Sequence, residues 1–285
     1  MLHLIDTDNL SNEQIEQIFL DAKAFKNKEL KEDLSDKLII NTFFENSTRT
    51  RTSFEIAAKR LKIEVVNLNL EKSSMEKGET LMDTLLNVCM MDPDAVIIRN
   101  KDNDIAYKLA EIDYTQVINA GAGNFAHPSQ ALLDLYTLKE RLGSIKGKTI
   151  AIVGDIINSR VASSNIKLLR RMGMNVILVA PPEYVPETRL PRYNKIEEII
   201  DRVDVIMSLR SQIERHVGKF KTKINYCIDK KLLGDRNIIV LHPGPVMRNI
   251  DISDEILNDE RCLVLNQVNN GVYIRMAILK LILRG

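Results

Sequence analysis

The sequence of 285 residues contains only three cysteines, and they lie far apart, at positions 89, 227 and 262. Their number is odd, and their spacing suits neither a disulfide framework nor a metal-binding cluster. No combination of His, Cys and Asp has the spacing of metal ligands. We therefore expect buried free thiols and no bound metal.

Long apolar runs are also missing, so the sequence predicts no helix that spans a membrane. The first residues include Asp6, where a signal peptide would carry positive charge before a longer apolar stretch. Hydrophobic residues make up 45% and charged residues 28% of the chain, which is typical of a globular protein. We expect a soluble, cytoplasmic protein.

Charge of one sign is not in excess, because the formal net charge is only +1. No global field therefore draws the chain to nucleic acid or to a lipid surface, and anion binding must come from local clusters. Glycine-rich nucleotide motifs are missing too. Gly154 is not followed by a second and third glycine at dinucleotide-binding spacing, and no Walker sequence is present. The partners are expected to be small molecules, with no nucleotide cofactor.

Short β-branched runs alternate with helical patterns, which predicts parallel sheets with crossover helices. We expect strands near residues 37–44, 63–70, 95–100, 116–121, 148–153, 175–180, 203–209 and 237–241. The leucines of 130–142 mark a helix that bridges two domains, and 272–283 is a strongly apolar terminal helix. The predicted fold is α/β with two domains, each a mostly parallel sheet with helices on both faces. The domains are expected at 1–130, with 271–285 packing back on it, and at 131–270.

Unusual polar residues follow the predicted strands in both halves. They include Ser73, Arg99 and His127 in the first half, and Arg160, Arg210 and His242 in the second. In open parallel sheets, ligands bind outside the carboxyl ends of the strands. The sequence thus predicts an active site in a cleft between the two domains.

The most informative segment is Ser47-Thr48-Arg49-Thr50-Arg51, which lies between an apolar strand and an amphipathic helix. Unpaired N–H groups and the helix dipole favour an anion at such a position, and guanidinium groups add charge and planar donors. Ordinary N-capping would explain one hydroxyl but not the whole cluster. We therefore interpret the segment as a phosphate-binding turn.

Other candidates are weak when taken singly. His127, just before Pro128, suits a structural cap as well as a carbonyl donor, and Arg99 at a strand end suits a surface ion pair as well as a substrate clamp. The segment from Ser73 to Gly78 suits a solvated loop as well as a lid. The joint placement of His127 and Arg99 with the phosphate turn favours the functional interpretation of both residues.

These motifs, with Lys77-Gly78-Glu79-Thr80 and His127-Pro128-Ser129-Gln130, resemble the aspartate/ornithine transcarbamoylase family. The second half, with Leu209-Arg210-Ser211-Gln212 and His242-Pro243-Gly244-Pro245, is similar to the catalytic chains of the aspartate-specific branch. The resemblance covers nearly the whole chain. It implies transfer of the carbamoyl group of carbamoyl phosphate to L-aspartate, giving N-carbamoyl-L-aspartate and phosphate in pyrimidine synthesis.

The resemblance also implies roles for individual residues. Thr50, Arg99 and His127 would be catalytic, as donors to the carbonyl oxygen, and the aspartate carboxylates would meet arginines and a glutamine. The carbamoyl phosphate set is Ser47, Thr48, Arg49, Thr50, Arg99, His127 and Gln130; the aspartate set is Lys77, Arg160, Arg210 and Gln212; the cleft wall is His242, Pro243, Gly244 and Pro245. The family is trimeric, and Ser73 and Lys77 would come from a neighbouring subunit.

Two alternatives stay open on the sequence alone. One is a transcarbamoylase for another amine acceptor such as ornithine, although two arginines favour a dicarboxylate. The other is a non-catalytic subunit with the same fold. No segment indicates whether a regulatory chain or a dihydroorotase associates with the trimer.

Overall fold

The computed structural model describes residues 1–285 except 46, 70–78, 211–225 and 285. The chain divides into two compact units. Unit 1 is Met1–Leu133 together with Asn269–Gly285, and unit 2 is Asp134–Val268. Within the described ranges, no helix combines the length and apolar character needed to cross a bilayer.

Unit 1 contains a four-stranded parallel sheet in the order β2-β1-β3-β4. Its strands are β1 (Leu38–Phe43), β2 (Glu64–Asn69), β3 (Ala95–Asn100) and β4 (Gln116–Ala122). β1 and β3 are central and almost fully buried, and most of their residues are apolar, as expected for strands covered on both faces. All four strands were predicted from those runs.

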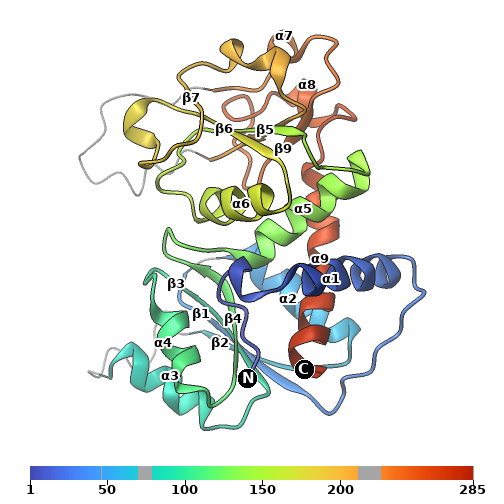
Figure 1. Ribbon diagram of the computed structural model, residues 1–285. Coiled ribbons are helices and arrows are strands. Elements are labelled where there is room, and N and C mark those ends of the chain that lie inside the picture. Colours follow the sequence, from blue (N-terminus) through green and yellow to red (C-terminus); the bar gives the residue numbers. More distant parts are fainter. Residues whose placement is uncertain (46, 70–78, 211–225, 285) are drawn as a thin grey trace. The chain divides into compact units, whose positions relative to one another are not determined.

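Helices cover both faces of this sheet (Figure 1). Four of them are α1 (Asn12–Lys26), α2 (Thr48–Arg60), α3 (Leu81–Cys89) and α4 (Ile105–Ile112). α3 and α4 bury Leu85, Val88 and Leu109 against Ile40, Val96 and Ile98 of the sheet. α2 lies on the opposite side, where Phe54, Ala57 and Ala58 are buried. The alternation of side chains along each strand supplies an apolar surface to both layers.

Unit 2 contains a five-stranded parallel sheet in the order β7-β6-β5-β8-β9. Its strands are β5 (Thr149–Val153), β6 (Asn175–Val179), β7 (Arg192–Tyr193), β8 (Val205–Ser208) and β9 (Ile239–Leu241). Four of these were predicted. β7 was not, because it is a two-residue edge strand with a polar sequence.

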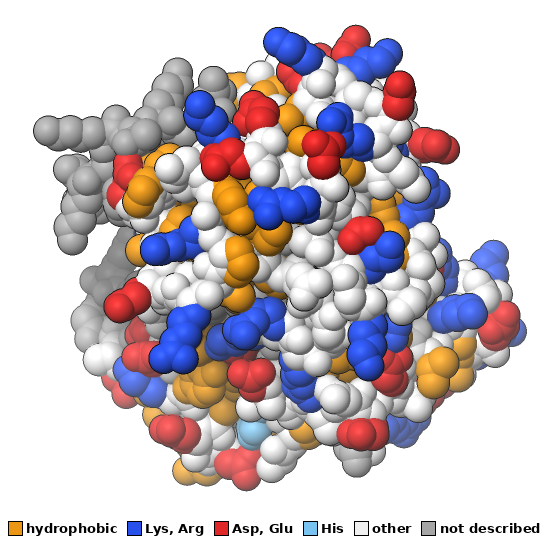
Figure 2. Space-filling model, turned by 45° about the horizontal axis from the view of Figure 1, so that its top comes forward, with side chains coloured by type: hydrophobic (Ala, Val, Ile, Leu, Met, Phe, Trp, Pro, Cys, Tyr) orange, Lys and Arg blue, Asp and Glu red, His pale blue; other side chains and the backbone are white. Residues whose placement is uncertain are grey.

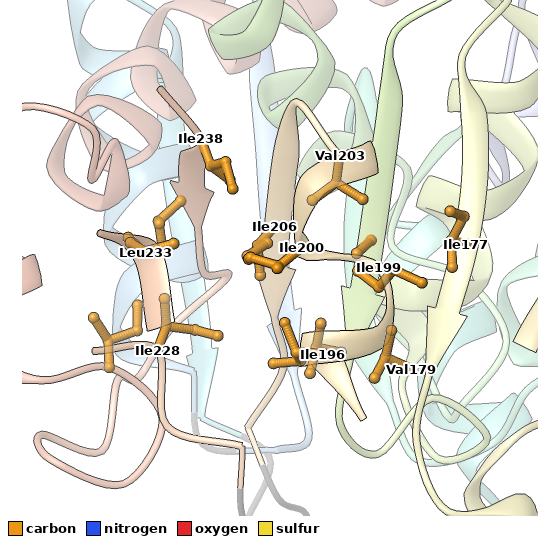
Figure 3. Close-up of a cluster of buried hydrophobic side chains, with 14 of the residues drawn as sticks. Ile177, Val179, Ile196, Ile199, Ile200, Val203, Ile206, Ile228, Leu233 and Ile238 are labelled. Carbon is orange, nitrogen blue, oxygen red and sulfur yellow. The ribbon is translucent and has the colours of Figure 1, made fainter. Parts of the chain in front are cut away.

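One hydrophobic core cluster of unit 2 lies on one face of this sheet (Figure 3). Ile177, Val179 and Ile206 of the strands belong to the same cluster as residues of two short 3₁₀ helices, η5 (Ile196–Glu198) and η6 (Ile200–Arg202). These residues are Ile196 of η5, Ile200 of η6 and Ile199 between the two helices. Residues of α7 (Lys230–Leu233) and α8 (Asp254–Leu257) complete the cluster. α6 (Arg160–Arg171) packs on the other face (Figure 1). The predicted α/β class with two parallel-sheet domains is confirmed.

Two longer helices contribute residues to both units. α5 (Pro128–Leu142) starts where the sequence predicted a helix after His127. α9 (Val264–Arg284) starts earlier than the predicted residue 272. The prediction was too short because the first turns of α9 are polar and expose Leu265 (77%), so they carry no apolar periodicity.

The three cysteines are free thiols, and only Cys89 is fully buried. Burial raises the pKa of Cys89 to about 11, which keeps it protonated. Cys227 and Cys262 are half-buried, so the expectation of three buried thiols was wrong for these two. On the surface drawn in Figure 2, basic and acidic side chains are interspersed, in keeping with the net charge of +1.

Candidate active site

In unit 1, the proposed carbamoyl phosphate residues follow three strands that are neighbours in the sheet. The turn Ser47–Thr50 follows β1, Arg99 lies at the end of β3, and the segment His127–Gln130 follows β4. Since β1, β3 and β4 are adjacent and parallel, their carboxyl ends share one edge. Sheet topology therefore gathers the predicted anion turn and the predicted carbonyl donors at a single edge.

The predicted phosphate turn forms the start of α2. Ser47 is the N-cap residue, yet among the described residues its hydroxyl accepts no capping hydrogen bond from the first turn. Thr48 and Arg49 are exposed, whereas Thr50 is 7% exposed. The positive end of the helix dipole and exposed donors thus occur together, as an anion site requires.

Arg51 differs from its neighbour Arg49. Its Nε donates to Oδ1 of Asn67 on β2, 3.3 Å away, and Nδ2 of Asn41 donates to the same oxygen at 2.9 Å. Arg51 thus links α2 to the sheet, and its proposed part in the phosphate turn stays a prediction. Arg49 is the exposed cation of the turn.

Arg99 is held at the end of β3 by two contacts. Its Nε lies 3.3 Å from Oε2 of Glu45, and the two side chains are only 14% and 15% exposed. Its Nη1 donates to the carbonyl of Ala120 on β4 at 3.4 Å. A carboxylate and a carbonyl therefore restrict the guanidinium to this edge of the sheet. The sequence analysis did not assign a role to Glu45.

His127 immediately precedes α5, and Gln130 lies in the first turn of this helix. His127 is 4% exposed and Gln130 is 8% exposed. The carbonyl of His127 accepts the N–H groups of Gln130 and Ala131, at 3.1 and 3.2 Å. This places His127 at the helix N-terminus, where a neutral imidazole can present one N–H to a carbonyl oxygen.

Unit 2 repeats this arrangement with different chemistry. Arg160 follows β5, Arg210 follows β8 and His242 follows β9, and these three strands are adjacent and parallel. Arg160 is the first residue of α6, whose N-cap Ser159 accepts the N–H of Ala162 at 3.2 Å. Two guanidinium groups at one edge can each bind a carboxylate with two parallel hydrogen bonds.

Gly154 allows the chain after β5 to pass close to the segment before Arg210. Its φ is +116°, and a Cβ there would lie 3.0 Å from the carbonyl oxygen of Leu209. A small pocket opens at this end of the sheet, lined by Val153, Gly154, Ser208, Leu209, Tyr226, Ile250 and Asp251. Burial raises the pKa of Tyr226 to about 12, so its hydroxyl stays neutral and donates to the carbonyl of Asn194 at 2.5 Å.

The segment His242–Pro245 is held by a buried polar network. Nδ1 of His242 accepts the N–H of Gly244 at 2.8 Å, and its Nε2 lies 3.1 Å from Oδ2 of Asp251. The N–H of His242 donates to Gln267, whose Nε2 donates to Asp134 at 2.7 Å. Neither Asp251 nor Asp134 was assigned a role from the sequence, because only the fold brings them to this segment.

Three predicted site residues, Ser73, Lys77 and Gln212, lie outside the described residues. Within the described part of the chain, no group of three or more His, Cys, Asp or Glu side chains could hold a metal ion.

Each half of the chain matches the model of a known protein family. The family model of the aspartate/ornithine carbamoyltransferase carbamoyl-P binding domain matches residues 2–140, and that of the Asp/Orn binding domain matches residues 146–282. The aspartate carbamoyltransferase catalytic subunit of a Sulfurovum species is 62% identical over 99% of this chain and 98% of its own length. That of Sulfurimonas denitrificans is 54% identical over 98% of both chains.

Solved structures show the same likeness. Aspartate transcarbamoylase from Trypanosoma cruzi, in complex with carbamoyl aspartate and phosphate, has a TM-score of 0.87 and 31% identity, covering 97% of this chain and 94% of its own. The catalytic subunit of the M. jannaschii enzyme has a TM-score of 0.87 and 30% identity, covering 100% of this chain and 98% of its own. The chain therefore belongs to the aspartate/ornithine carbamoyltransferase family.

Proposed function

We propose that this chain is a carbamoyltransferase that transfers the carbamoyl group of carbamoyl phosphate to L-aspartate, giving N-carbamoyl-L-aspartate and phosphate. The observation that carries the proposal is the shared edge of unit 1: the start of α2, which follows β1, and Arg99, at the end of the adjacent strand β3, both lie there. The T. cruzi relative binds carbamoyl aspartate and phosphate, the two products of this reaction. The reaction belongs to pyrimidine biosynthesis.

The first-domain residues suit the chemistry of the donor substrate. Ser47, Thr48, Arg49 and Thr50 hold the phosphate through hydroxyl, guanidinium and backbone N–H groups. Gln130 binds the carbamoyl amide. Thr50, Arg99 and His127 donate to the carbonyl oxygen, which gains negative charge as the amine attacks. Hydrogen-bond donors fixed in this way typically raise kcat by about 10²- to 10³-fold each.

The proposed transfer needs no metal, no nucleotide and no side chain as a base, because every bond and proton is accounted for by the two substrates. The amine nitrogen of aspartate forms a bond to the carbamoyl carbon, and the bond from that carbon to the phosphate oxygen breaks. The departing phosphate takes the proton that the amine loses. The protein contributes orientation and charge stabilisation.

The second-domain residues suit a dicarboxylate acceptor. Arg160 and Arg210, with Gln212 beside the latter, bind the two carboxylates of aspartate, and backbone carbonyls of His242–Pro245 accept from its amine. Ornithine carries one carboxylate and a second amine, so a pair of guanidinium groups disfavours it. This is the reason to prefer aspartate over the ornithine alternative.

Assembly and location remain proposals that rest on the family. We expect a homotrimer in the cytoplasm, with Ser73 and Lys77 of one subunit completing the site of the next.

The proposal is tested by incubating the purified protein with ¹³C-labelled carbamoyl phosphate and aspartate. Equal amounts of labelled N-carbamoyl-aspartate and phosphate should form in the presence of a chelator and without nucleotide. A protein that binds carbamoyl phosphate but makes no product would instead support the non-catalytic alternative.

A further inference from the structure

Arg275 is a buried cation in the last helix, only 3% exposed, and it reaches two other helices at once. Its Nη1 donates to Oγ of Ser53 on α2 at 2.9 Å, and its Nη2 lies within hydrogen-bond distance of Oγ of Ser129 on α5, at 3.3 Å. All three residues belong to unit 1.

Both serines lie next to proposed substrate-binding residues. Ser53 is three residues after Thr50, so it is on the following turn and on the same side of α2. Ser129 stands in the first turn of α5, between His127 and Gln130. The guanidinium of Arg275 therefore connects the segment that holds the phosphate with the segment that faces the carbamoyl end.

The position of the guanidinium is fixed by its surroundings. Nη1 also donates to the carbonyl of Gly271, one turn earlier in α9, at 3.0 Å, and the guanidinium carbon lies 5.1 Å from the centre of the Phe54 ring. A Cβ on Gly271 would lie only 2.7 Å from Nη1 and 3.2 Å from Cδ2 of Leu133. Glycine at 271 thus leaves the space that the guanidinium occupies.

We infer that Arg275 is a positioning residue for carbamoyl transfer: its planar fork, bound to the second turn of α2 and the first turn of α5, sets the starts of these two helices relative to each other. Carbamoyl phosphate spans these helix starts, since its phosphate is bound by one and its amide and carbonyl by the other. Inorganic phosphate, which has no carbamoyl group, needs only the start of α2 for binding. The inference rests on the proposed function, because it assigns these two ends of the substrate to the two helices.

An arginine is needed for this task. Its two η nitrogens are held at a fixed separation in one plane and donate in different directions, whereas a lysine has one nitrogen on a flexible stem. Replacing Arg275 with lysine keeps the charge but cannot reproduce the fixed pair of contacts. A misalignment of about 1 Å at a reacting centre can cost on the order of 10²-fold in rate.

The experiment compares two ligands that differ only in the amide. Methylphosphonate tests the phosphate turn alone, and phosphonoacetamide adds the carbamoyl-like amide to the same group. Titration calorimetry gives the dissociation constant of each ligand for the wild type and for Arg275→Lys and Arg275→Met. The ratio used below is the dissociation constant of methylphosphonate divided by that of phosphonoacetamide, so a value above one means that the amide adds affinity. In both variants we expect the ratio to fall towards one, methylphosphonate affinity to stay close to wild type, and kcat to fall ~10- to 100-fold.

Two further proteins separate positioning from general damage. Arg60→Met is the matched control, because Arg60 of α2 stacks on Tyr273 of α9 at 5.3 Å, and its replacement removes an arginine from the same helix pair. It should keep the wild-type ratio. If Arg275→Met does not fold, the double variant Ser53→Ala/Ser129→Ala removes the two hydroxyl acceptors and should reduce the ratio in the same way.

The outcomes distinguish this inference from the proposed function. A wild-type protein that is active and prefers phosphonoacetamide, with a ratio unchanged in the folded arginine and serine variants, overturns the role of Arg275 alone. A wild-type protein with no preference for phosphonoacetamide overturns the proposed carbamoyl phosphate site and this inference with it.

Discussion

His242 and Asp251 form a buried pair, with 3.1 Å between Nε2 of the imidazole and Oδ2 of the carboxylate. Because Nδ1 of His242 accepts the N–H of Gly244, the proton of the neutral ring is on Nε2, where it is donated to Asp251. The same Oδ2 accepts the N–H of Met247 at 2.8 Å. One carboxylate thus fixes both the ring and the turn that follows it.

Asp251→Ala should therefore disturb the cleft-wall segment without touching the phosphate turn. It leaves the ring N–H and the Met247 N–H without their acceptor, and each loss of this kind costs about 1–3 kcal/mol. We expect the KM for aspartate to rise more than the KM for carbamoyl phosphate. Steady-state kinetics and urea unfolding measure the two effects, and a loss of stability with an unchanged KM for aspartate would assign Asp251 to folding alone.

Each unit also has a lysine–aspartate clamp at the opposite end of its sheet. In unit 2, Nζ of Lys148 and the N–H of Thr149 both donate to Asp204, each at 2.8 Å. In unit 1, Lys37 and the N–H of Leu38 contact Asp94 in the same way, at 3.0 and 2.9 Å. Both clamps join the start of a central strand to the residue before its neighbour.

The unit 2 clamp predicts a defined loss of stability in acid. Burial alone would raise the pKa of Asp204, but the hydrogen bonds from Lys148 and Thr149 outweigh it and lower the pKa below the ordinary 3.8. The stabilisation is therefore present above about pH 4 and lost as the pH falls through the lower folded pKa. Asp204→Asn should lose less stability than the wild type between about pH 6 and about pH 3.

Urea unfolding at each pH measures this difference. Asp201→Asn is the control, because Asp201 pairs with Arg236 while 75% exposed, and exposed pairs contribute little. If wild type and Asp204→Asn lost the same free energy of unfolding on acidification, the clamp would not be the source of the acid sensitivity.

His127→Ala should separate turnover from phosphate binding. If His127 donates to the carbonyl oxygen, kcat should fall by about 10²- to 10³-fold, while methylphosphonate affinity stays near wild type because the anion is bound by Ser47–Thr50 and Arg99. Asn124→Ala, an exposed position in the same loop, is the control. A carbamoyl group found covalently attached to His127 of the wild-type protein would refute the donor role.

A site shared between subunits predicts complementation. Lys77→Ala and His127→Ala proteins should each be nearly inactive. After dissociation, mixing and reassembly, some interfaces of a mixed trimer would pair an intact Lys77 with an intact His127, so activity should return. Verified mixed trimers no more active than either parent would mean that Lys77 serves its own chain.

The strands were predictable from the sequence because both faces of each central strand are buried, so β1, β3, β5 and β8 consist mostly of apolar residues. The candidate site was predictable for a related reason, since parallel strands bring the residues that follow them to one edge. The two-residue strand β7 and the polar start of α9 lack such a pattern.

The supporting residues were not predictable, because their contacts join distant segments. Arg275 and Ser53 are 222 positions apart, and Gln267 and Asp134 are 133 apart. Local periodicity carries no information about such pairs. Arg51 illustrates the converse, since its place in the motif suggested phosphate, whereas the fold also gives it Asn67 as a partner.

Competition between acceptors tests the central claim most directly. The purified protein is given limiting labelled carbamoyl phosphate with equal concentrations of aspartate and ornithine in one vessel, and the two products are quantified by mass spectrometry. The pairing of Arg160 and Arg210 with two carboxylates predicts carbamoyl-aspartate as the dominant product in wild type, and a reduced share of it in Arg210→Ala. Citrulline, the product from ornithine, in equal or greater amount would contradict the account.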